Sequence, residues 1–299
     1  MIARGPFEAA ERVSAPDSLF WRTPRRSIAL ARPVLLGIVN LTPDSFSDGG
    51  RYPSVDAAVE GALALEADGA DVIDVGGEST RPGSQPVPVE EERRRVLPFV
   101  ERAAPRLRIP ISVDTTKLEV ARAALDAGAE IVNDISGLRF EPRLGTLAAE
   151  RGAGLILMHL RGVPRTMQQE IHYDDLIGEV TAELAASLET ARAAGCRDDQ
   201  LVVDPGIGFG KTAEHNLILL NRLDALQTLG RPLLVGPSRK SFLGKALDLP
   251  VEDRLEGTLA ACVVALLRGA RLFRVHDVRS VRRALDLAES IRRADGSGG

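Results

Sequence analysis

From residue 33 onward, short runs rich in Val, Ile and Leu alternate with longer stretches in which apolar residues recur at helical spacing. Eight runs are predicted as strands: Val34–Val39, Asp71–Val75, Ile111–Val113, Ile131–Asn133, Gly154–Met158, Leu201–Val203, Leu233–Val235 and Leu272–Val275. The predicted helices lie near residues 55–68, 89–104, 117–127, 142–151, 174–194, 214–226, 253–269 and 277–292. Most strand runs are continuously apolar, which is typical of parallel strands buried on both faces.

Eight successive βα pairs favour a closed barrel over a doubly wound open sheet, which usually has about six strands. We therefore predict an α/β fold, a single-domain (β/α)8 TIM barrel over residues 33–293, preceded by an extension at 1–32 and followed by a flexible tail at 294–299. The extension holds several arginines, but Glu8, Glu11 and Asp17 argue against a transit peptide. We interpret it as a short strand pair that covers the bottom of the barrel.

The sequence becomes polar where the predicted strands end. These polar positions are Asn40, Gly77–Arg81, Asp114, Asn133–Asp134, His159, Asp204, Ser238–Lys240 and Arg274–His276. The carboxyl ends of the strands carry the active site in barrels of this kind. We therefore expect these side chains to surround one mouth.

Asp114, Asn133 and Asp204 each follow a different strand, so the fold would point all three into one cavity. A carboxylate such as that of Asp204 can accept two parallel hydrogen bonds from an amino group and an adjacent ring NH, the edge that a pterin presents. The amide of Asn133 can both donate and accept, which suits a mixed ring edge. The alternative is that each residue only caps the following helix.

Two basic segments follow the seventh and eighth strands. Lys240 lies in Gly236–Ser241, and Arg274 and His276 lie in Arg274–Asp277 at the end of the eighth strand. Loops at these positions commonly bind phosphate, so an anionic leaving group is expected there. Alternatively, Arg239 and Lys240 form a solvated loop pair.

Two long loops follow the first and second strands. Residues 40–50 combine hydroxyls, carboxylates and terminal glycines, which indicates a lid, and Asn40 offers a neutral oxygen for Mg²⁺. A simple turn at Pro43 and Asp44 is the alternative. The loop at 76–83 contributes Arg81, whose guanidinium could hold a carboxylate or phosphate.

The segment Gly206–Thr212 resembles a nucleotide-binding loop only superficially, because Pro205 occupies the first glycine position and the spacing is GxGxG. We predict instead that its glycines let the backbone pass close to a flat ligand, that Phe209 forms a wall, and that Lys211 is structural. His159 remains open between a buried structural role and a ligand contact.

Charge and composition restrict the classes of partner that we expect for this protein. The formal net charge is −4 and the pI is about 5.7, so no global positive field would attract nucleic acid. No apolar stretch reaches the length of a membrane span. The two cysteines, Cys196 and Cys262, lack the spacing of a zinc site or a disulfide framework, which favours the cytoplasm.

Several segments resemble dihydropteroate synthases. The two longest are Val39–Gly50 and Asp74–Gly83. The likeness continues through Ser112–Thr115, Asn133–Ile135, Leu157–His159, Asp204–Gly206, Ser238–Ser241 and Arg274–Val278. It extends over nearly the whole chain after residue 33.

The resemblance implies an enzyme of folate biosynthesis, a transferase that condenses (7,8-dihydropterin-6-yl)methyl diphosphate with 4-aminobenzoate and that sulfonamides target. It implies a pterin diphosphate site of Thr80, Asp114, Asn133, Asp204, Lys240, Arg274 and His276, to which the interpretation of Gly206–Thr212 adds Phe209. It also implies a 4-aminobenzoate site of Thr42, Pro43, Phe46, Thr80, Arg81 and Ser238, with Mg²⁺ held by Asn40. A homodimer is expected as well.

The catalytic residues expected on this basis are Asp44, Asp114, Lys240, Arg274 and His276. Arg274, His276 and Mg²⁺ would neutralise the departing diphosphate, and the carboxylates would stabilise a cationic pterin methylene. Two alternatives remain. One is a noncatalytic pterin-binding paralogue, and the other is a methyltetrahydrofolate-binding domain of a corrinoid methyltransferase.

Overall fold

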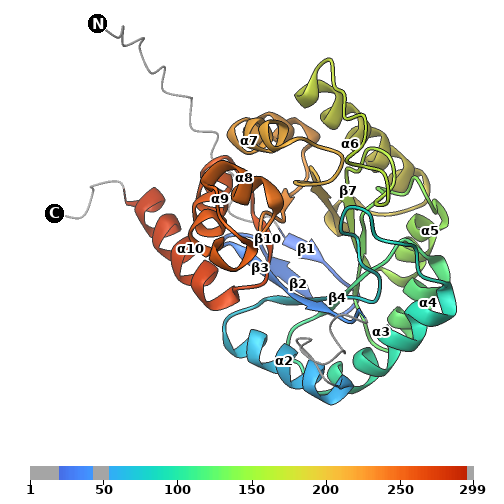
Figure 1. Ribbon diagram of the computed structural model, residues 1–299. Coiled ribbons are helices and arrows are strands. Elements are labelled where there is room, and N and C mark those ends of the chain that lie inside the picture. Colours follow the sequence, from blue (N-terminus) through green and yellow to red (C-terminus); the bar gives the residue numbers. More distant parts are fainter. Residues whose placement is uncertain (1–19, 43–53, 295–299) are drawn as a thin grey trace, which may run out of the picture.

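Eight parallel strands form the centre of the molecule and helices form a ring around them (Figure 1). The computed structural model describes residues 20–42 and 54–294. The barrel strands are β3 (Val34–Asn40), β4 (Val72–Gly76), β5 (Ile111–Asp114), β6 (Ile131–Asp134), β7 (Gly154–Met158), β8 (Leu201–Asp204), β9 (Leu234–Val235) and β10 (Leu272–Val275). Their order is β8-β7-β6-β5-β4-β3-β10-β9, and a bridge between Val203 and Leu233 connects the two ends of the sheet. The predicted barrel and its eight strands are confirmed.

The predicted helices are also present, with boundaries that differ by a few residues. They are α2 (Val55–Ala67), α3 (Val89–Ala103), α4 (Leu118–Asp126), α5 (Arg143–Arg151), α6 (Leu176–Ala193), α7 (Ala213–Asn221), α9 (Leu255–Leu267) and α10 (Val278–Arg293). The sequence analysis missed α8 (Ser241–Leu247) and the 3-10 helices η1 (Asp198–Gln200), η2 (Leu223–Leu229) and η3 (Val251–Asp253). These elements are too short to produce a helical period in the sequence.

Several helices begin where a polar side chain replaces a missing backbone partner. Ser54 accepts a hydrogen bond from the backbone N of Ala57 at the start of α2, and Asp175 does the same for Gly178 in α6. Thr212 accepts from the backbone N of His215 at the start of α7. Such caps fix where each helix begins and therefore how long the preceding loop at the barrel mouth can be.

The alternation of side chains along each strand separates two apolar layers. Leu35 and Val39 of β3 face the helices and belong to the large outer core, whereas Val34 and Leu36 point into the barrel. The inner layer at the bottom of the barrel consists of Trp21, Leu30, Val34, Leu36, Val72, Ile131, Ile156, Val202, Leu234 and Leu272. Two residues further along a strand, the next inward-facing side chain lies nearer the mouth.

A hairpin covers the bottom of the barrel. Its strands are β1 (Phe20–Arg22) and β2 (Ser27–Ala29), which pair antiparallel. The Trp21 side chain is fully buried in the inner layer, and its Nε1 donates a hydrogen bond to the backbone O of Gln200 at 2.8 Å. The expected strand pair is present, while the predicted limits of extension, barrel and tail remain predictions.

Candidate active site

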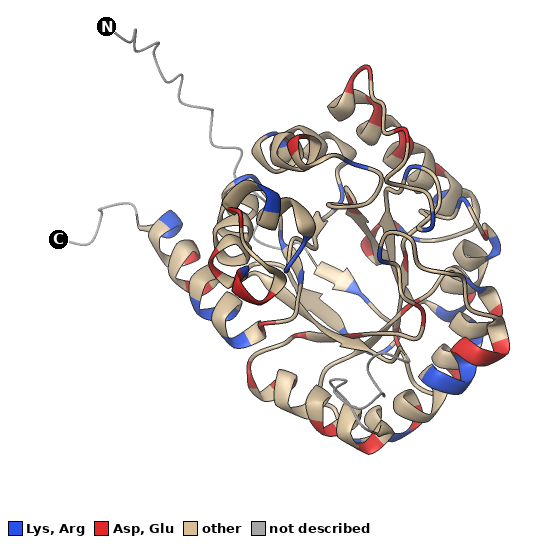
Figure 2. Cartoon of the chain, in the orientation of Figure 1, with Lys and Arg blue, Asp and Glu red and all other residues tan. Residues whose placement is uncertain are grey.

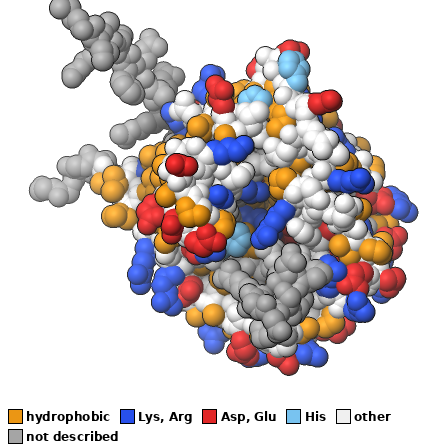
Figure 3. All heavy atoms as spheres, in the orientation of Figure 1, with side chains coloured by type: hydrophobic (Ala, Val, Ile, Leu, Met, Phe, Trp, Pro, Cys, Tyr) orange, Lys and Arg blue, Asp and Glu red, His pale blue; other side chains and the backbone are white. Residues whose placement is uncertain are grey.

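The inward-facing positions of the strands change from apolar at the bottom to polar at the mouth. Val72, Ile131, Val202 and Leu272 belong to the inner apolar layer. Two residues later on the same strands come Asp74, Asn133, Asp204 and Arg274, respectively. The pocket that they help to form is lined by Thr80, Asp114, Asn133, Ile135, Met158, Asp204, Ile207, Phe209, Gly236, Lys240 and Arg274. Figure 3 shows a depression at the centre of the molecule in which basic side chains gather.

Arg274 forms the central ion pair of this pocket. Its Nε donates to Asp74 Oδ2 at 2.6 Å and its Nη2 to Asp114 Oδ2 at 2.9 Å. The two carboxylates hold the pKa of the Arg274 guanidinium above its usual range even though burial acts in the opposite direction. The strand ends β4, β5 and β10 are thereby connected through one side chain.

Asp74 is a functional candidate that the sequence analysis missed. It is fully buried, and besides Arg274 it accepts hydrogen bonds from Asn133 Nδ2 at 3.3 and 3.4 Å. It therefore orients two of the predicted ligand-binding side chains. A carboxylate within a continuously apolar strand requires a buried partner, and this signal could have identified it.

Asp114 and Asp204 are buried carboxylates whose environments favour the protonated form. Burial raises the pKa of Asp114, and the nearby Arg274 opposes this shift. Burial raises the pKa of Asp204 to about 6, opposed by a hydrogen bond of 2.7 Å from the backbone N of Gly206 and by the charge of Lys240. A ligand that donates hydrogen bonds to these oxygens would stabilise their ionised forms.

Lys240 and Phe209 lie against each other in the pocket. Lys240 Nζ is 3.9 Å from the centroid of the Phe209 ring, which is a cation–π contact. Burial lowers the pKa of Lys240 to about 8, and the nearby Arg274 acts in the same direction. The alternative of a solvated Arg239–Lys240 pair is wrong for Lys240, which lines the pocket, whereas the partly exposed Arg239 makes a bidentate ion pair with Asp277 at 3.0 and 2.6 Å.

His276 is held by Ser238 beside the eighth strand. Ser238 Oγ lies 3.0 Å from His276 Nδ1 and also accepts a hydrogen bond from the backbone N of His276 at 3.2 Å. The Ser238 hydroxyl can donate to Nδ1 or accept from it, depending on the His276 tautomer, and both contacts fix the position of the imidazole beside the pocket.

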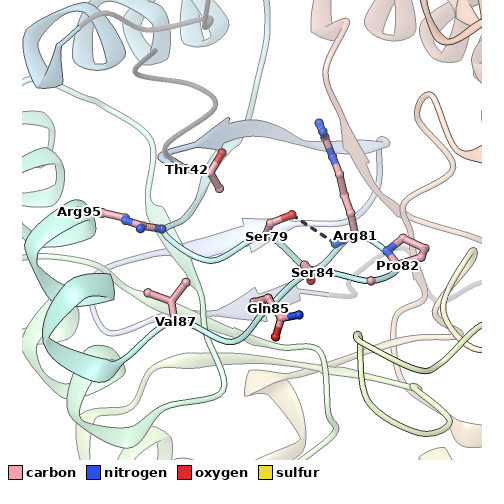
Figure 4. A pocket seen from close by; sticks show the side chains of 9 residues that line it. Thr42, Ser79, Arg81, Pro82, Ser84, Gln85, Val87 and Arg95 are labelled. Carbon is pink, nitrogen blue, oxygen red and sulfur yellow. Dashed lines mark hydrogen bonds between the residues drawn. The ribbon is translucent and has the colours of Figure 1, made fainter.

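The predicted 4-aminobenzoate residues do not all lie together. Thr80 lines the inner pocket, and Ser238 is buried beside His276. Thr42 and Arg81 line a second, outer hollow of about 420 Å³, together with Ser79, Pro82, Gly83, Ser84, Gln85, Val87 and Arg95. Figure 4 shows Arg95 and Arg81 on opposite sides of Ser79, with Thr42 above Ser79 in this view. Pro43, Asp44 and Phe46 lie outside the described residues.

The helix-cap alternative fails for all three strand-end residues. Asp204 does not cap α7, because Thr212 does. The helix after β5 begins next to Lys117 without a side-chain cap, so Asp114 does not cap it. Asn133 donates to Asp74 rather than to a helix end, and the neighbouring Asp134 instead accepts from the backbone N of Ser136 and Leu138. Asp114 and Asn133 therefore remain available to contact a ligand in the pocket.

Metal-binding groups are sparse in the described ranges. Within residues 20–42 and 54–294, no group of three or more His, Cys, Asp and Glu side chains is arranged to hold a metal ion. Asn40 ends β3 and is half-buried, next to Gly76 of β4. A single amide oxygen suits a Mg²⁺ ion that keeps most of its waters and binds substrate phosphates.

Comparison with known proteins identifies the class. Residues 36–276 match the model of the pterin binding enzyme family. A dihydropteroate synthase of Synechocystis sp. is 49% identical over 261 residues, which are 87% of this chain and 90% of that protein. The crystal structure of Yersinia pestis dihydropteroate synthase with a sulfonamide drug superimposes with a TM-score of 0.87 at 42% identity, covering 92% of this chain and 100% of that one. The Xanthomonas albilineans enzyme with 4-aminobenzoic acid gives 0.86 at 44% identity, covering 93% and 99%.

The fold and the pocket thus define a pterin-binding enzyme built on a TIM barrel. More specifically, the chain belongs to the dihydropteroate synthase family. Enzymes of this family are transferases that join a dihydropterin methyl diphosphate to 4-aminobenzoate in folate biosynthesis. The activity predicted from the sequence is therefore confirmed.

Proposed function

We propose that the barrel-mouth pocket binds the dihydropterin ring edge-on against Asp204 and Asn133. The observation that carries this assignment is the convergence of Asp204, Asn133 and Lys240 on one pocket. The ionised carboxylate of Asp204 accepts from the amino group and the adjacent ring NH, and the Asn133 amide meets the remaining edge. Phe209 and Met158 supply apolar walls for the ring, and Thr80 closes the pocket on the side of the β4 loop.

The chemistry that this arrangement supports is displacement of diphosphate from the pterin methylene. The C–O bond to the diphosphate breaks, a C–N bond forms to the amino group of 4-aminobenzoate, and that nitrogen loses one proton. Arg274 and His276 stabilise the departing negative charge, and Asp114 stabilises positive charge on the methylene. Lys240 holds the ring, and Asp44 is proposed to act with Asp114. An arylamine is neutral at pH 7, so positioning and electrostatics supply most of the rate.

Mg²⁺ is proposed as the cofactor, held on the protein by Asn40. The ion would shield the diphosphate oxygens. The half-buried amide at the end of β3 and the lack of a carboxylate cluster in the described ranges fit an ion that arrives with the substrate. Removal of Mg²⁺ with a chelator should therefore abolish turnover while the unfolding temperature changes little.

The 4-aminobenzoate site is proposed to form between the two hollows. Thr80 belongs to the inner pocket, and Thr42 and Arg81 to the outer one. The guanidinium of Arg81 offers a partner for the carboxylate of 4-aminobenzoate. Pro43, Phe46 and Ser238 complete the proposed set. Sulfonamides would compete at this site, since they mimic the arylamine.

A coupled assay tests these assignments. Purified enzyme should release diphosphate from the dihydropterin substrate only when 4-aminobenzoate and Mg²⁺ are both present. A noncatalytic paralogue would bind the pterin and release nothing. Diphosphate release that does not depend on 4-aminobenzoate would contradict the proposed reaction at this site.

A homodimer is proposed on the face formed by α7, α9 and α10. These helices pack together, and their outer faces expose large apolar side chains: Leu217, Ile218, Val264, Leu267, Leu287 and Ile291. Several large exposed apolar side chains on helices that pack together are typical of a protein interface. Leu267→Glu together with Leu287→Glu should shift the mass measured by light scattering from dimer to monomer. A wild-type monomer at micromolar concentration would contradict this proposal.

Cytoplasmic location also remains a proposal, supported by the two free cysteines.

A further inference from the structure

Lys211 is a buried lysine whose two hydrogen-bond partners among the described residues are both uncharged. Its side chain is 2% exposed, and its Nζ donates to the backbone O of Phe209 at 2.9 Å and lies 2.8 Å from His159 Nδ1. Burial and the charge of Lys211 lower the pKa of His159 to about 4, so the imidazole is neutral and accepts from the ammonium. A buried charge bound only to neutral groups lowers the stability of the native state. A lysine at this position is therefore a candidate for a functional role.

The loop that precedes Lys211 is closely packed against its neighbours. Gly206 has a φ of +68°, and a Cβ there would lie 1.9 Å from the backbone O of His159. A Cβ on Gly208 would lie 2.9 Å from Lys240 Cδ. The segment from Asp204 to Lys211 is therefore a thin strip of backbone between the pterin pocket and the His159–Lys211 pair.

The pair is anchored on the side away from the pocket by α6. His159 Nε2 lies 3.2 Å from Glu183 Oε2, although the two are not aligned as a hydrogen bond. Arg161 Nη2 pairs with Glu183 Oε1 at 2.5 Å and with Glu179 Oε2 at 2.8 Å. The imidazole is thus held in place with Nδ1 directed at Lys211.

We propose that Lys211 is a positioning residue of the pterin site, which fixes Phe209 through its backbone carbonyl and places a positive charge behind Asp204. This inference rests on the proposed binding of the pterin edge by Asp204. The charge keeps Asp204 in the ionised form that accepts hydrogen bonds from the ring. The hydrogen bond to the carbonyl keeps the aromatic wall at the distance that the flat ring requires.

The surrounding charges support this role. Asp204 and Glu183 stabilise the ammonium of Lys211, while Arg161 and Lys240 disfavour it, and burial lowers its pKa to about 7. In turn, the positive charges of Lys240, Lys211 and Arg274 lower the pKa of Asp204 and so oppose the effect of burial. Since the pKa of Asp204 is about 6, Lys211 is still protonated where Asp204 titrates. Loss of the lysine charge would raise the pKa of Asp204 further.

The test separates the hydrogen bond from the charge. Lys211→Met removes both, Lys211→Gln keeps a donor for the Phe209 carbonyl without the charge, and Lys245→Met, at an exposed lysine of α8, is the matched control. Binding of 6-hydroxymethyl-7,8-dihydropterin is measured by calorimetry between pH 5 and 9. The wild type should lose affinity as the pH falls through about 6, where Asp204 becomes protonated.

Both Lys211 variants should move this acid midpoint to higher pH by about one unit. At pH 8, where Asp204 is ionised in every form, Lys211→Met should still bind about tenfold more weakly because the carbonyl has lost its donor. Lys211→Gln and Lys245→Met should bind there like the wild type.

A purely structural lysine would lower the unfolding temperature and leave both the midpoint and the affinity unchanged, which would overturn the proposal. If Lys211→Met does not fold, the acid midpoint of Lys211→Gln decides alone. Failure of the wild type itself to bind the dihydropterin would contradict the proposed pterin site instead.

Discussion

Glu130 at the bottom of the barrel and Asp204 at its mouth are both buried carboxylates, but they have different numbers of hydrogen-bond donors. At the bottom, Glu130 is fully buried and receives hydrogen bonds from Thr23 Oγ1 at 2.6 Å and Arg25 Nη2 at 3.0 Å, and it also pairs with Arg26. All three donors come from the hairpin region that covers this end. At the mouth, the described residues offer Asp204 one hydrogen bond, from the backbone N of Gly206.

The difference shows where the fold gives up stability for function. A carboxylate saturated with donors stabilises the native state, whereas one with few donors has a raised pKa and retains acceptor capacity for a ligand. Asp114 and Asp204, whose pKa values are raised, are carboxylates of the second kind. Charged side chains are otherwise spread over the outer helices (Figure 2). Changes at the bottom should therefore affect stability, and changes at the mouth should affect activity.

The largest effect on activity is expected from Arg274→Ala. The guanidinium proposed to face the diphosphate is lost, and Asp74 and Asp114 both lose their ion pair with it. We expect kcat/KM to fall about a thousandfold. Initial rates of diphosphate release measure this, with Arg279→Ala on α10 as the control, because Arg279 is exposed and pairs only with Asp68 among the described residues. Wild-type turnover in Arg274→Ala would refute the assignment.

The largest effect on stability is expected from Trp21→Ala. The indole fills the bottom of the barrel, and a Cβ on Gly154 would already lie 3.1 Å from it. Its removal should lower the unfolding free energy by about 3 to 5 kcal/mol. Urea denaturation measures the loss, with the exposed Phe20 replaced by Ala as the control. The kcat/KM of the folded enzyme should stay unchanged, and a large drop would show that the two ends are coupled.

A smaller, paired effect compares one carboxylate from each end. Glu130→Gln should lower the unfolding free energy by about 2 kcal/mol and leave kcat/KM unchanged. Asp74→Asn should lower kcat/KM roughly 10- to 100-fold, because Arg274 and Asn133 lose the group that orients them. Both variants are measured in the same denaturation and rate assays. The contrast between the ends fails if the two substitutions give the same pattern.

The sequence predicted the barrel well because its signal is repeated. Each continuous apolar run between helical stretches indicates a buried parallel strand, and the same alternation places Asp204 and Arg274 at one end. Elements without repetition were missed, such as α8, which is only 7 residues long. Its start at Ser241 depends on the packing of the preceding loop, where Arg239 adopts a φ of +57°.

A site residue can be predicted from the sequence when its own side-chain chemistry and its position indicate its role. It cannot be predicted when its role depends on a partner residue that is distant in the sequence. Lys240 and Asn133 were identified from their positions at strand ends. Asp74 was not, because its role depends on Arg274, which lies 200 residues away in the sequence. Lys211 was interpreted as structural for the same reason, since His159 and the carbonyl of Phe209 meet it only in the folded chain.

The smallest expected effect is a pH dependence that Lys240 imposes on the mouth. Its pKa is lowered to about 8, so the positive charge is lost above that pH and kcat/KM for the dihydropterin diphosphate should fall as the pH rises from 8 to 9. Lys240→Arg keeps the charge and should remove this decline, although its optimum rate is lower.

The unfolded chain retains the lysine proton up to about pH 10.4, so the same ionisation makes the free energy of unfolding rise with pH over this range. Activity and stability would then change in opposite directions, as expected if a half-buried cation at the mouth lowers the stability of the native state. A decline near pH 8 that persists in Lys240→Arg would assign this ionisation to another group.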